Sequence, residues 1–232
     1  MKRLLTLFLV CLTITLPLSG RISCLFSPDD KPTKKLLEYI RSAQKSIYIA
    51  MYMLTDKNIA EALIIAKKSK NLNIHIIVDP ITAEGGSYGK ADLLAANGID
   101  VFVFDPKIKP LKTPIKNDRW GANGAIMHNK FAIFDEVLLW TGSFNWTVSA
   151  NMHNSENVII TDDRDTCKKY RLYFETLMNR CHRHVAPAGK NKQKSSLHQS
   201  LAHLLQTTPD DATLLEQLTY LIGNYAIITQ KD

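Results

Sequence analysis

In residues 46–104, segments with the apolar pattern of a β-strand alternate with segments that have the apolar spacing of a helix. In residues 56–70, Ile59, Leu63 and Ala66 recur at intervals of four and three, which places them on one side of a helix. Asn97-Gly98 is a signal that ends a helix. The pattern predicts strands at 46–54, 72–78 and 100–104 and helices at 56–70 and 88–96.

A hairpin is predicted next along the chain. Residues 126–134 alternate apolar and polar positions around Phe131 and Ile133, and a turn at Asp135-Glu136 separates them from the apolar run 137–140. A further strand at 157–161 and a long helix at 166–180 complete the region. Such alternation predicts an α/β fold, in which helices flank a mixed sheet in one domain.

The hairpin carries a motif of fixed spacing, His-x-Lys-x4-Asp-x6-Gly-Ser-x-Asn. On an extended strand, His128 and Lys130 leave the same face, because they are two residues apart. A neutral imidazole can attack a phosphodiester phosphorus and form a covalent intermediate. A Lys ammonium, a Ser hydroxyl and an Asn amide can stabilise charge on the phosphate oxygens. The motif residues are His128, Lys130, Asp135, Gly142, Ser143 and Asn145.

These residues resemble the phospholipase D superfamily, especially its small members with one such HKD motif per chain. Those members are bacterial secreted endonucleases, Rickettsia-type phospholipase D proteins and mitochondrial cardiolipin hydrolases. The resemblance runs from Lys31 to Arg183 and is densest in MHNKFAIFD, TGSFNWT and NSENVIITDD. It implies a phospholipase D-like mixed sheet and a metal-independent phosphodiesterase. The cysteine-rich zinc-binding insert of some members is not apparent, so we expect no metal site and no cofactor.

The resemblance also implies a role for each motif residue. His128 is the nucleophile, and Lys130, Ser143 and Asn145 bind the phosphate. Asp135 belongs to the motif in a role more structural than chemical. Glu156, in Asn154-Ser155-Glu156-Asn157, matches the carboxylate that holds the histidine ring by its other nitrogen and fixes the tautomer.

The motif occurs once, so one chain is expected to hold half of a catalytic site. A second imidazole must protonate the leaving oxygen, and His75 and His153 are poor candidates because His75 lies in an apolar run and His153 lacks the following Lys. A twofold homodimer that shares one site would place His128 opposite its copy. The protonation states of the two rings would then be coupled.

Both ends of the chain differ in pattern from the core. Residues 1–23 begin with Lys2-Arg3 and an apolar run to Leu16, which predicts a signal peptide. The alternative is an uncleaved anchor, although the run is shorter than the roughly 20 residues of a spanning helix. An exported protein, periplasmic or secreted, is therefore expected. After a catalytic domain at 31–185, the sequence predicts a linker at 186–196 and two amphipathic helices in a C-terminal extension at 197–232. These helices would pack on the core or across the dimer, or dock on a membrane or partner.

The net positive charge of the chain favours a polyanionic substrate. The net charge is +7, and basic residues crowd a proline-punctuated loop between Asp105 and Gly121. The loop is either a solvated segment or a substrate rim that follows a nucleic-acid backbone or anionic headgroups. The candidate rim residues are Lys107, Lys109, Lys112, Lys116 and Arg119.

The sequence favours an exported endonuclease that hydrolyses DNA or RNA through a phosphohistidine. The alternative is a phospholipase D acting on phosphatidylcholine or cardiolipin-type lipids, with membrane association, and a third class is an inactive nucleic-acid-binding module.

Asp162, Asp163 and Asp165 precede a helix, so we interpret them as cap and dipole partners rather than metal ligands. Cys167 and Cys181 lie roughly 20 Å apart if one helix joins them, and no essential disulfide is expected.

Overall fold

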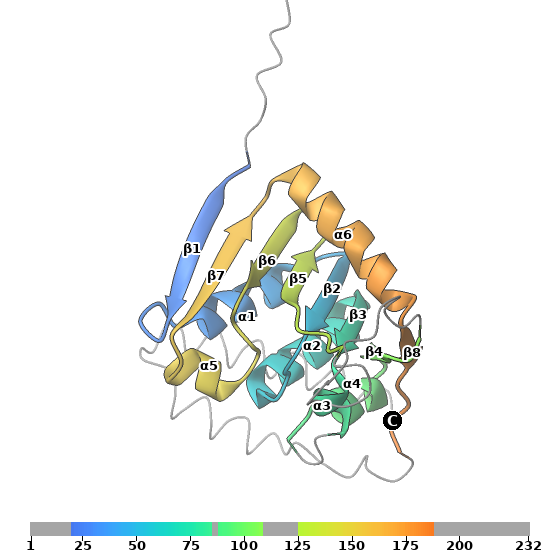
Figure 1. The fold of residues 1–232 in the computed structure, drawn as a ribbon. Helices are drawn as coiled ribbons and strands as arrows, with labels where there is room; N and C mark the ends of the chain where they lie inside the picture. Colours follow the sequence, from blue (N-terminus) through green and yellow to red (C-terminus); the bar gives the residue numbers. More distant parts are fainter. Residues whose placement is uncertain (1–19, 85–87, 109–124, 188–232) are drawn as a thin grey trace, which may run out of the picture.

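The described residues of the computed structural model, 20–84, 88–108 and 125–187, form an eight-stranded sheet with helices on both faces (Figure 1). The strand order is β1-β7-β6-β5-β2-β3-β4-β8; β2, β3 and β4 are parallel and the other neighbours are antiparallel. The strands are β1 (Ile22–Ser27), β2 (Ser46–Met51), β3 (Asn73–Val78), β4 (Asp100–Phe104), β5 (Lys130–Phe134), β6 (Leu138–Gly142), β7 (Glu156–Thr161) and β8 (Cys181–Arg183). The helices are α1 (Pro32–Ser42), α2 (Lys57–Lys70), α3 (Pro80–Glu84), α4 (Ala91–Ala96), α5 (Val148–Met152) and α6 (Arg164–Met178). The mixed α/β fold expected from the sequence is confirmed.

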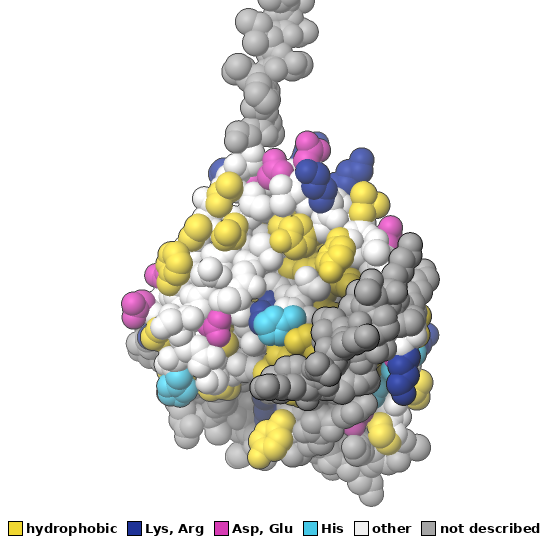
Figure 2. Space-filling model, in the orientation of Figure 1, with side chains coloured by type: hydrophobic (Ala, Val, Ile, Leu, Met, Phe, Trp, Pro, Cys, Tyr) yellow, Lys and Arg dark blue, Asp and Glu magenta, His cyan; other side chains and the backbone are white. Residues whose placement is uncertain are grey.

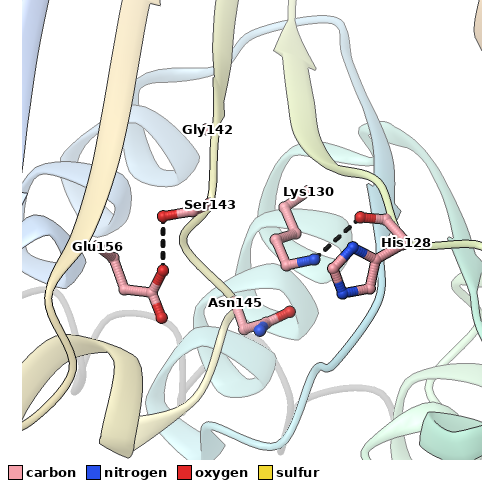
Figure 3. A pocket seen from close by; sticks show the side chains of 6 residues that line it. All are labelled: His128, Lys130, Gly142, Ser143, Asn145 and Glu156. Atoms are coloured by element: carbon pink, nitrogen blue, oxygen red, sulfur yellow. Dashed lines mark hydrogen bonds between the residues drawn. The ribbon is translucent and has the colours of Figure 1, made fainter.

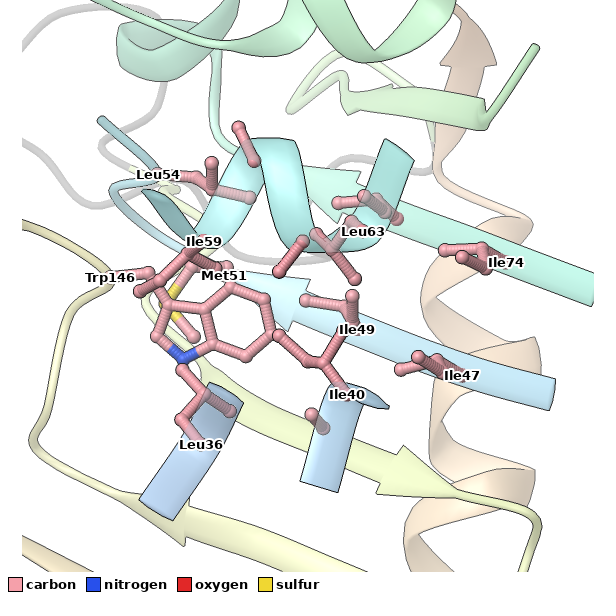
Figure 4. Close-up of a cluster of buried hydrophobic side chains, with 14 of the residues drawn as sticks. Leu36, Ile40, Ile47, Ile49, Met51, Leu54, Ile59, Leu63, Ile74 and Trp146 are labelled. Carbon is pink, nitrogen blue, oxygen red and sulfur yellow. The ribbon is translucent and has the colours of Figure 1, made fainter. Parts of the chain in front are cut away.

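Two hydrophobic clusters hold the helices to the sheet. On one face, α1, α2 and α4 pack on alternate residues of the central strands, and Trp146 fills the space between α1 and α2 (Figure 4). On the other face, α6 covers Tyr48, Phe131 and Ile133 with residues that include Phe174 and Leu177. β2 is buried on both faces, which explains why it is apolar along nearly its whole length. The sequence predicted this strand at 46–54, and it ends at Met51.

Local signals set the ends of the long helices. The Asp56 carboxylate accepts hydrogen bonds from the amides of Asn58 and Ile59 at the start of α2, and Asn71 ends the helix in the left-handed region. Asp163 caps α6 by accepting from the Thr166 amide. The interpretation of this acidic run as a helix cap is therefore confirmed for Asp163, while Asp162 pairs with Arg21.

The β5–β6 hairpin explains the acidic pair between its strands. Asp135 and Glu136 both have positive φ, 52° and 62°, and lie at the centre of a tight turn in which the Val137 amide donates to the Phe134 carbonyl. The Asp135 carboxylate accepts hydrogen bonds from the backbone amides of Gln44, Lys45 and Ser46 at the start of β2. Asp135 therefore joins two neighbouring strands at the end of the sheet that lies away from the motif's other residues.

Several elements differ from the sequence predictions. The hairpin strand predicted at 126–134 begins only at Lys130, because residues 126–129 make no ladder with a neighbouring strand. β1 was not predicted, and it begins at Ile22, inside the segment 1–23 that was assigned to a leader. Its six residues pair with β7, so the sheet extends beyond the start of the domain predicted at 31–185. Other elements that were not predicted are α1, α3, α5 and β8.

Some sequence predictions lie outside the described residues. These are most of the leader at 1–23, the rim residues from Lys109 to Arg119, most of the linker at 186–196 and the helices at 197–232. Within the described ranges, no helix is long and apolar enough to span a membrane.

Candidate active site

The motif residues meet at one edge of the sheet. Because β5, β6 and β7 are antiparallel neighbours, the start of β5, the end of β6 and the start of β7 lie side by side. They enclose a pocket of about 390 Å³ (Figure 3). The pocket is lined by His128, Lys130, Gly142, Ser143, Asn145 and Glu156. The sequence prediction that these side chains form one site therefore agrees with their placement.

His128 lies just before β5 rather than within it, which corrects the predicted strand position. Its imidazole packs on Tyr52, with ring centroids 4.6 Å apart, and its carbonyl oxygen accepts a hydrogen bond from Lys130 Nζ at 2.9 Å. The chain on both sides is anchored: the Met127 amide donates to Asp79, and the Asn129 carbonyl accepts from the Tyr52 amide. The nucleophile candidate is thus exposed at the mouth of the pocket on a fixed backbone.

The imidazole of His128 is biased towards its neutral form. Its pKa is below the ordinary value of 6.5, first because contact with the protein desolvates the ring and second because the Lys130 ammonium is close. The carboxylate of Asp79 opposes this shift. At neutral pH the ring therefore has a free lone pair, which a nucleophile needs.

Lys130 is a buried cation, with 7% of its surface exposed. Its Nζ lies 4.9 Å from the centroid of the Tyr52 ring. Burial lowers the pKa of Lys130 from 10.5, and the negative charge of Glu156 opposes that effect. The ammonium has few competing partners among the described residues, so it is available to a phosphate oxygen in the pocket.

Gly142 and Ser143 form the wall contributed by β6. Gly142 has φ 154°, and a Cβ at this position would collide with the carbonyl oxygen of Asn157 on β7. The glycine is therefore required by the close approach of the neighbouring strand. The Ser143 amide donates to Asn157, and its hydroxyl donates to Glu156 Oε2 at 2.5 Å.

Asn145 is held between two buried aromatic residues. Phe144 and Trp146 are 1% and 0% exposed, and the Trp146 carbonyl accepts hydrogen bonds from the amides of Thr55 and Asp56. Asn145 Oδ1 is buried and has no hydrogen-bond partner among the described residues. The amide therefore lies beside Lys130 and His128 with bonding capacity left for a ligand (Figure 3).

Glu156 does not hold His128 within one chain, which corrects the predicted contact. Its carboxylate accepts from the Ser143 hydroxyl on one oxygen and from the side-chain amide of Asn154 at 3.1 Å on the other. Figure 3 shows Glu156 and His128 on opposite sides of the pocket, with Lys130 and Asn145 between them. Glu156 enters the pocket from β7, whereas His128 enters from the segment before β5, so the width of the sheet edge separates them.

Asp135 lies outside the pocket lining, although the motif groups it with the site. The hairpin turn carries it to the opposite end of β5, where it binds backbone amides. Its role is structural, as the resemblance implied. Lys107, the rim residue inside the described ranges, is exposed in a turn after β4 and does not line the pocket.

The other histidines considered for the acid are elsewhere. His75 lies within β3 and stacks on Tyr48 at 5.6 Å, and His153 is exposed after α5. Neither lines the pocket, where His128 is the one imidazole among the described residues. No group of three or more metal-binding side chains occurs in the described ranges.

The structure adds Tyr52 and Asp79 to the surroundings of the motif. Each directly follows a parallel strand, β2 or β3, and both contact the His128 segment. Polar residues at the carboxyl ends of parallel strands are a general signal for a functional site. That signal was present in the sequence but was not used.

Together, a neutral imidazole, a buried ammonium, a hydroxyl and an amide surround a space large enough for a phosphodiester. The imidazole can attack phosphorus, and the other groups can stabilise charge on the oxygens as it develops. The fold and pocket define a protein of the phosphodiesterase class.

A family model described as "Cardiolipin synthase, PLD-like domain" matches residues 36–178, and the chain belongs to the phospholipase D superfamily. Mitochondrial cardiolipin hydrolase of Xenopus laevis is 30% identical over 167 residues, covering 72% of this chain and 70% of that protein. Phospholipase D of Rickettsia felis is 32% identical over 153 residues, covering 66% of this chain and 67% of that protein. Nuc, a phospholipase D family member from Salmonella typhimurium, has a solved structure with a TM-score of 0.56 at 25% identity, covering 72% of this chain and 99% of Nuc. The chain is a phosphodiesterase of this superfamily, of the nuclease or phospholipase D kind.

Proposed function

We propose that the chain is a metal-independent endonuclease that cleaves DNA or RNA through a phosphohistidine at His128. The His128 imidazole attacks phosphorus, a nitrogen–phosphorus bond forms, and the bond to the leaving oxygen breaks as a second imidazole gives that oxygen a proton. Water then attacks phosphorus, the nitrogen–phosphorus bond breaks, and the second imidazole, which lost its proton in the first step, takes the proton of the water. Lys130, Ser143 and Asn145 bind the non-bridging oxygens in both steps.

One observation carries the choice of nucleic acid: none of the six residues that line the described pocket has an apolar side chain. A phosphodiester between two sugars needs polar contacts on both sides, and a net charge of +7 favours a polyanion. We propose that Lys107 and the basic residues from Lys109 to Arg119 extend these contacts along the phosphate backbone of the nucleic acid.

A second candidate is a phospholipase D that acts on cardiolipin-type or phosphatidylcholine lipids. It is favoured by the relatives at 30% and 32% identity, which are named mitochondrial cardiolipin hydrolase and phospholipase D. On this hypothesis the protein would bind a membrane surface. An inactive nucleic-acid-binding module is the weakest hypothesis, because the pocket retains every reacting group of the motif.

A homodimer that shares one site is part of the proposal. The pocket supplies one imidazole from the described residues, while the reaction needs two. Glu156 lies away from the His128 of its own chain, so in a twofold pair it would hold the ring of the partner subunit's His128. Identical rings could then act as nucleophile and acid.

The proposed dimer surface is formed by the part of the sheet face that α6 leaves uncovered, together with the exposed side of α6 itself. The register places Phe131, Thr141, Ile159 and Cys24 on one face, and α6 covers Phe131 but not Ile159. Apolar side chains gather on this face over β1, β7 and α6 (Figure 2). Those exposed by more than two fifths are Ile22, Phe26, Ile159, Leu172 and Tyr173. Tyr173 contacts Asn129 beside the nucleophile, so the face adjoins the pocket.

Export is the proposed location, on the basis of the charged and apolar start of the chain. The uncleaved anchor is the alternative, and N-terminal sequencing of the purified protein distinguishes the two.

The test is to incubate purified protein in EDTA with single-stranded DNA, RNA, phosphatidylcholine vesicles and cardiolipin vesicles. We expect cleavage of nucleic acid, loss of all turnover in His128→Asn and normal turnover in the control His153→Asn, which changes an exposed histidine outside the pocket. Cleavage of lipid alone would select the second candidate. Activity retained by His128→Asn, or lost on chelation, would contradict the mechanism.

A further inference from the structure

Asp79 is a buried carboxylate directly behind the nucleophile. It lies in the turn between β3 and α3, with 5% of its surface exposed. One carboxylate oxygen accepts from the Met127 amide at 2.9 Å, and the other accepts from the Ile81 amide at 3.1 Å. Both oxygens are therefore used, and one of them binds the residue that precedes His128.

A hydrogen-bond network fixes the backbone on both sides of His128. Met127 is tied to Asp79, and the Asn129 carbonyl is tied to the Tyr52 amide at 2.9 Å. Thr82, which is 2% exposed, links Asp79 to Tyr52. Its amide donates to the Asp79 carbonyl, and its hydroxyl donates to the Tyr52 carbonyl. The segment that carries His128 is therefore hydrogen-bonded to residues at the carboxyl ends of both β2 and β3.

The charged and titratable groups around the imidazole come from four elements. Asp79 after β3 is negative, Lys130 on β5 is positive, the Tyr52 phenol follows β2, and Glu156 on β7 faces the ring from across the pocket. Asp79 raises the pKa of His128, whereas desolvation and Lys130 lower it. Lys130 and Asp79 each bond to the backbone of this segment and affect the charge of the ring, Lys130 through the His128 carbonyl and Asp79 through the Met127 amide; of the two, Asp79 is the one that favours the charged ring.

We propose that Asp79 is a positioning residue for phosphoryl transfer, which anchors the backbone before His128 and places a fixed negative charge beside the imidazole. In the shared site, one ring must be neutral to attack and the other charged to protonate the leaving oxygen. Desolvation and Lys130 both disfavour the charged form, and the Asp79 carboxylate opposes them without reversing the shift. Asp79 acts through His128 and does not touch the substrate.

The test replaces Asp79 with asparagine, which removes the charge and leaves one oxygen to accept a hydrogen bond. Asp163→Asn is the matched control, because Asp163 also accepts from a backbone amide at a helix start but lies at α6. We expect kcat to fall about ten- to a hundredfold in Asp79→Asn, with KM changed less than about twofold. Without the carboxylate the pKa of His128 falls, so the pH optimum moves to lower pH.

A second readout does not depend on turnover. Titration of the His128 ring by NMR should show a lower pKa in Asp79→Asn than in wild type, and no change in Asp163→Asn. An unchanged His128 titration with an unchanged pH profile overturns the inference. The inference is also overturned if kcat falls together with the thermal midpoint while the pH optimum stays at its wild-type value. Asp79 would then have a structural role.

This inference rests on the proposed function of His128, and the two can fail separately. Full activity in His128→Asn would overturn the phosphohistidine mechanism itself. An inactive His128→Asn beside an Asp79→Asn protein with wild-type kcat and pH profile would keep the mechanism and overturn the role of Asp79.

Discussion

Ser143 donates its hydroxyl hydrogen to Glu156 Oε2 at 2.5 Å across the wall of the pocket. The carboxylate is held on its other oxygen by Asn154, so its position is set by its own chain before any imidazole reaches it. A carboxylate fixed in this way can orient a second ring without reorganising. This relationship connects the phosphate-binding wall with the proposed shared site.

Glu156→Gln tests that connection. The change keeps the shape of the side chain and removes the charge that raises the pKa of Lys130, so this pKa should fall further. Titration of the Lys130 ammonium by NMR measures this fall directly. Glu175→Gln on α6, where the carboxylate pairs with Arg171, is the control. A Lys130 titration in Glu156→Gln that is the same as in wild type would contradict the coupling.

Lys130→Met tests the buried cation. We expect kcat/KM to fall by about two to three orders of magnitude, the range for losing one group that stabilises transition-state charge. The thermal midpoint should be equal or higher, because the change removes an ammonium from a site that is 7% exposed. The pKa of His128 should rise, since Lys130 lowers it.

Lys168→Met, which changes an exposed lysine on α6, is the matched control for that variant. It should retain wild-type kcat/KM and pH dependence. A Lys130→Met protein with normal turnover would show that the phosphate is bound without this ammonium.

Asp135→Asn separates structure from chemistry within the motif. Asparagine tolerates the positive φ of this turn but has one acceptor oxygen for the three amides that the carboxylate binds. The free energy of unfolding should fall by about 2 kcal/mol, as for a lost hydrogen bond to a charged group. Denaturant unfolding measures this change, and Glu136→Gln in the same turn is the control.

Turnover per folded molecule should stay at the wild-type level in Asp135→Asn, because the residue does not line the pocket. A large fall in kcat without a loss of stability would give Asp135 a chemical role instead.

The central strands could be predicted from the sequence, because burial on both faces leaves a continuous apolar signal, and the helix between them could be predicted from apolar residues spaced along one side. α2 is the clearest case, since Ile59, Leu63 and Ala66 are buried as their spacing predicted. β1 gives no such signal, because five of its six residues are exposed or half-buried. Its strand conformation depends on pairing with β7, a partner more than a hundred residues away in the chain.

The site was predictable to the extent that it lies in one hairpin and the strand that follows. Lys130, Ser143 and Asn145 come together because adjacent antiparallel strands bring fixed spacings to one edge. Tyr52 and Asp79 follow strands that precede the motif by many residues. Their contact with the His128 segment depends on β2 pairing with β5 and on β3 pairing with the other edge of β2. Sequence spacing carries no information on that contact, nor on the separation of Glu156 from His128.

The most direct test of the shared phosphohistidine site is the activity of a purified heterodimer. One subunit carries His128→Asn and a first affinity tag, and the other is wild type with a second tag. Two successive affinity steps isolate the mixed pair. The control is a heterodimer in which His153→Asn replaces His128→Asn. The account predicts that the His128→Asn heterodimer has less than about a hundredth of the wild-type kcat, because one imidazole cannot serve both steps. About half of the wild-type activity would show that each chain holds a complete site and would contradict the account.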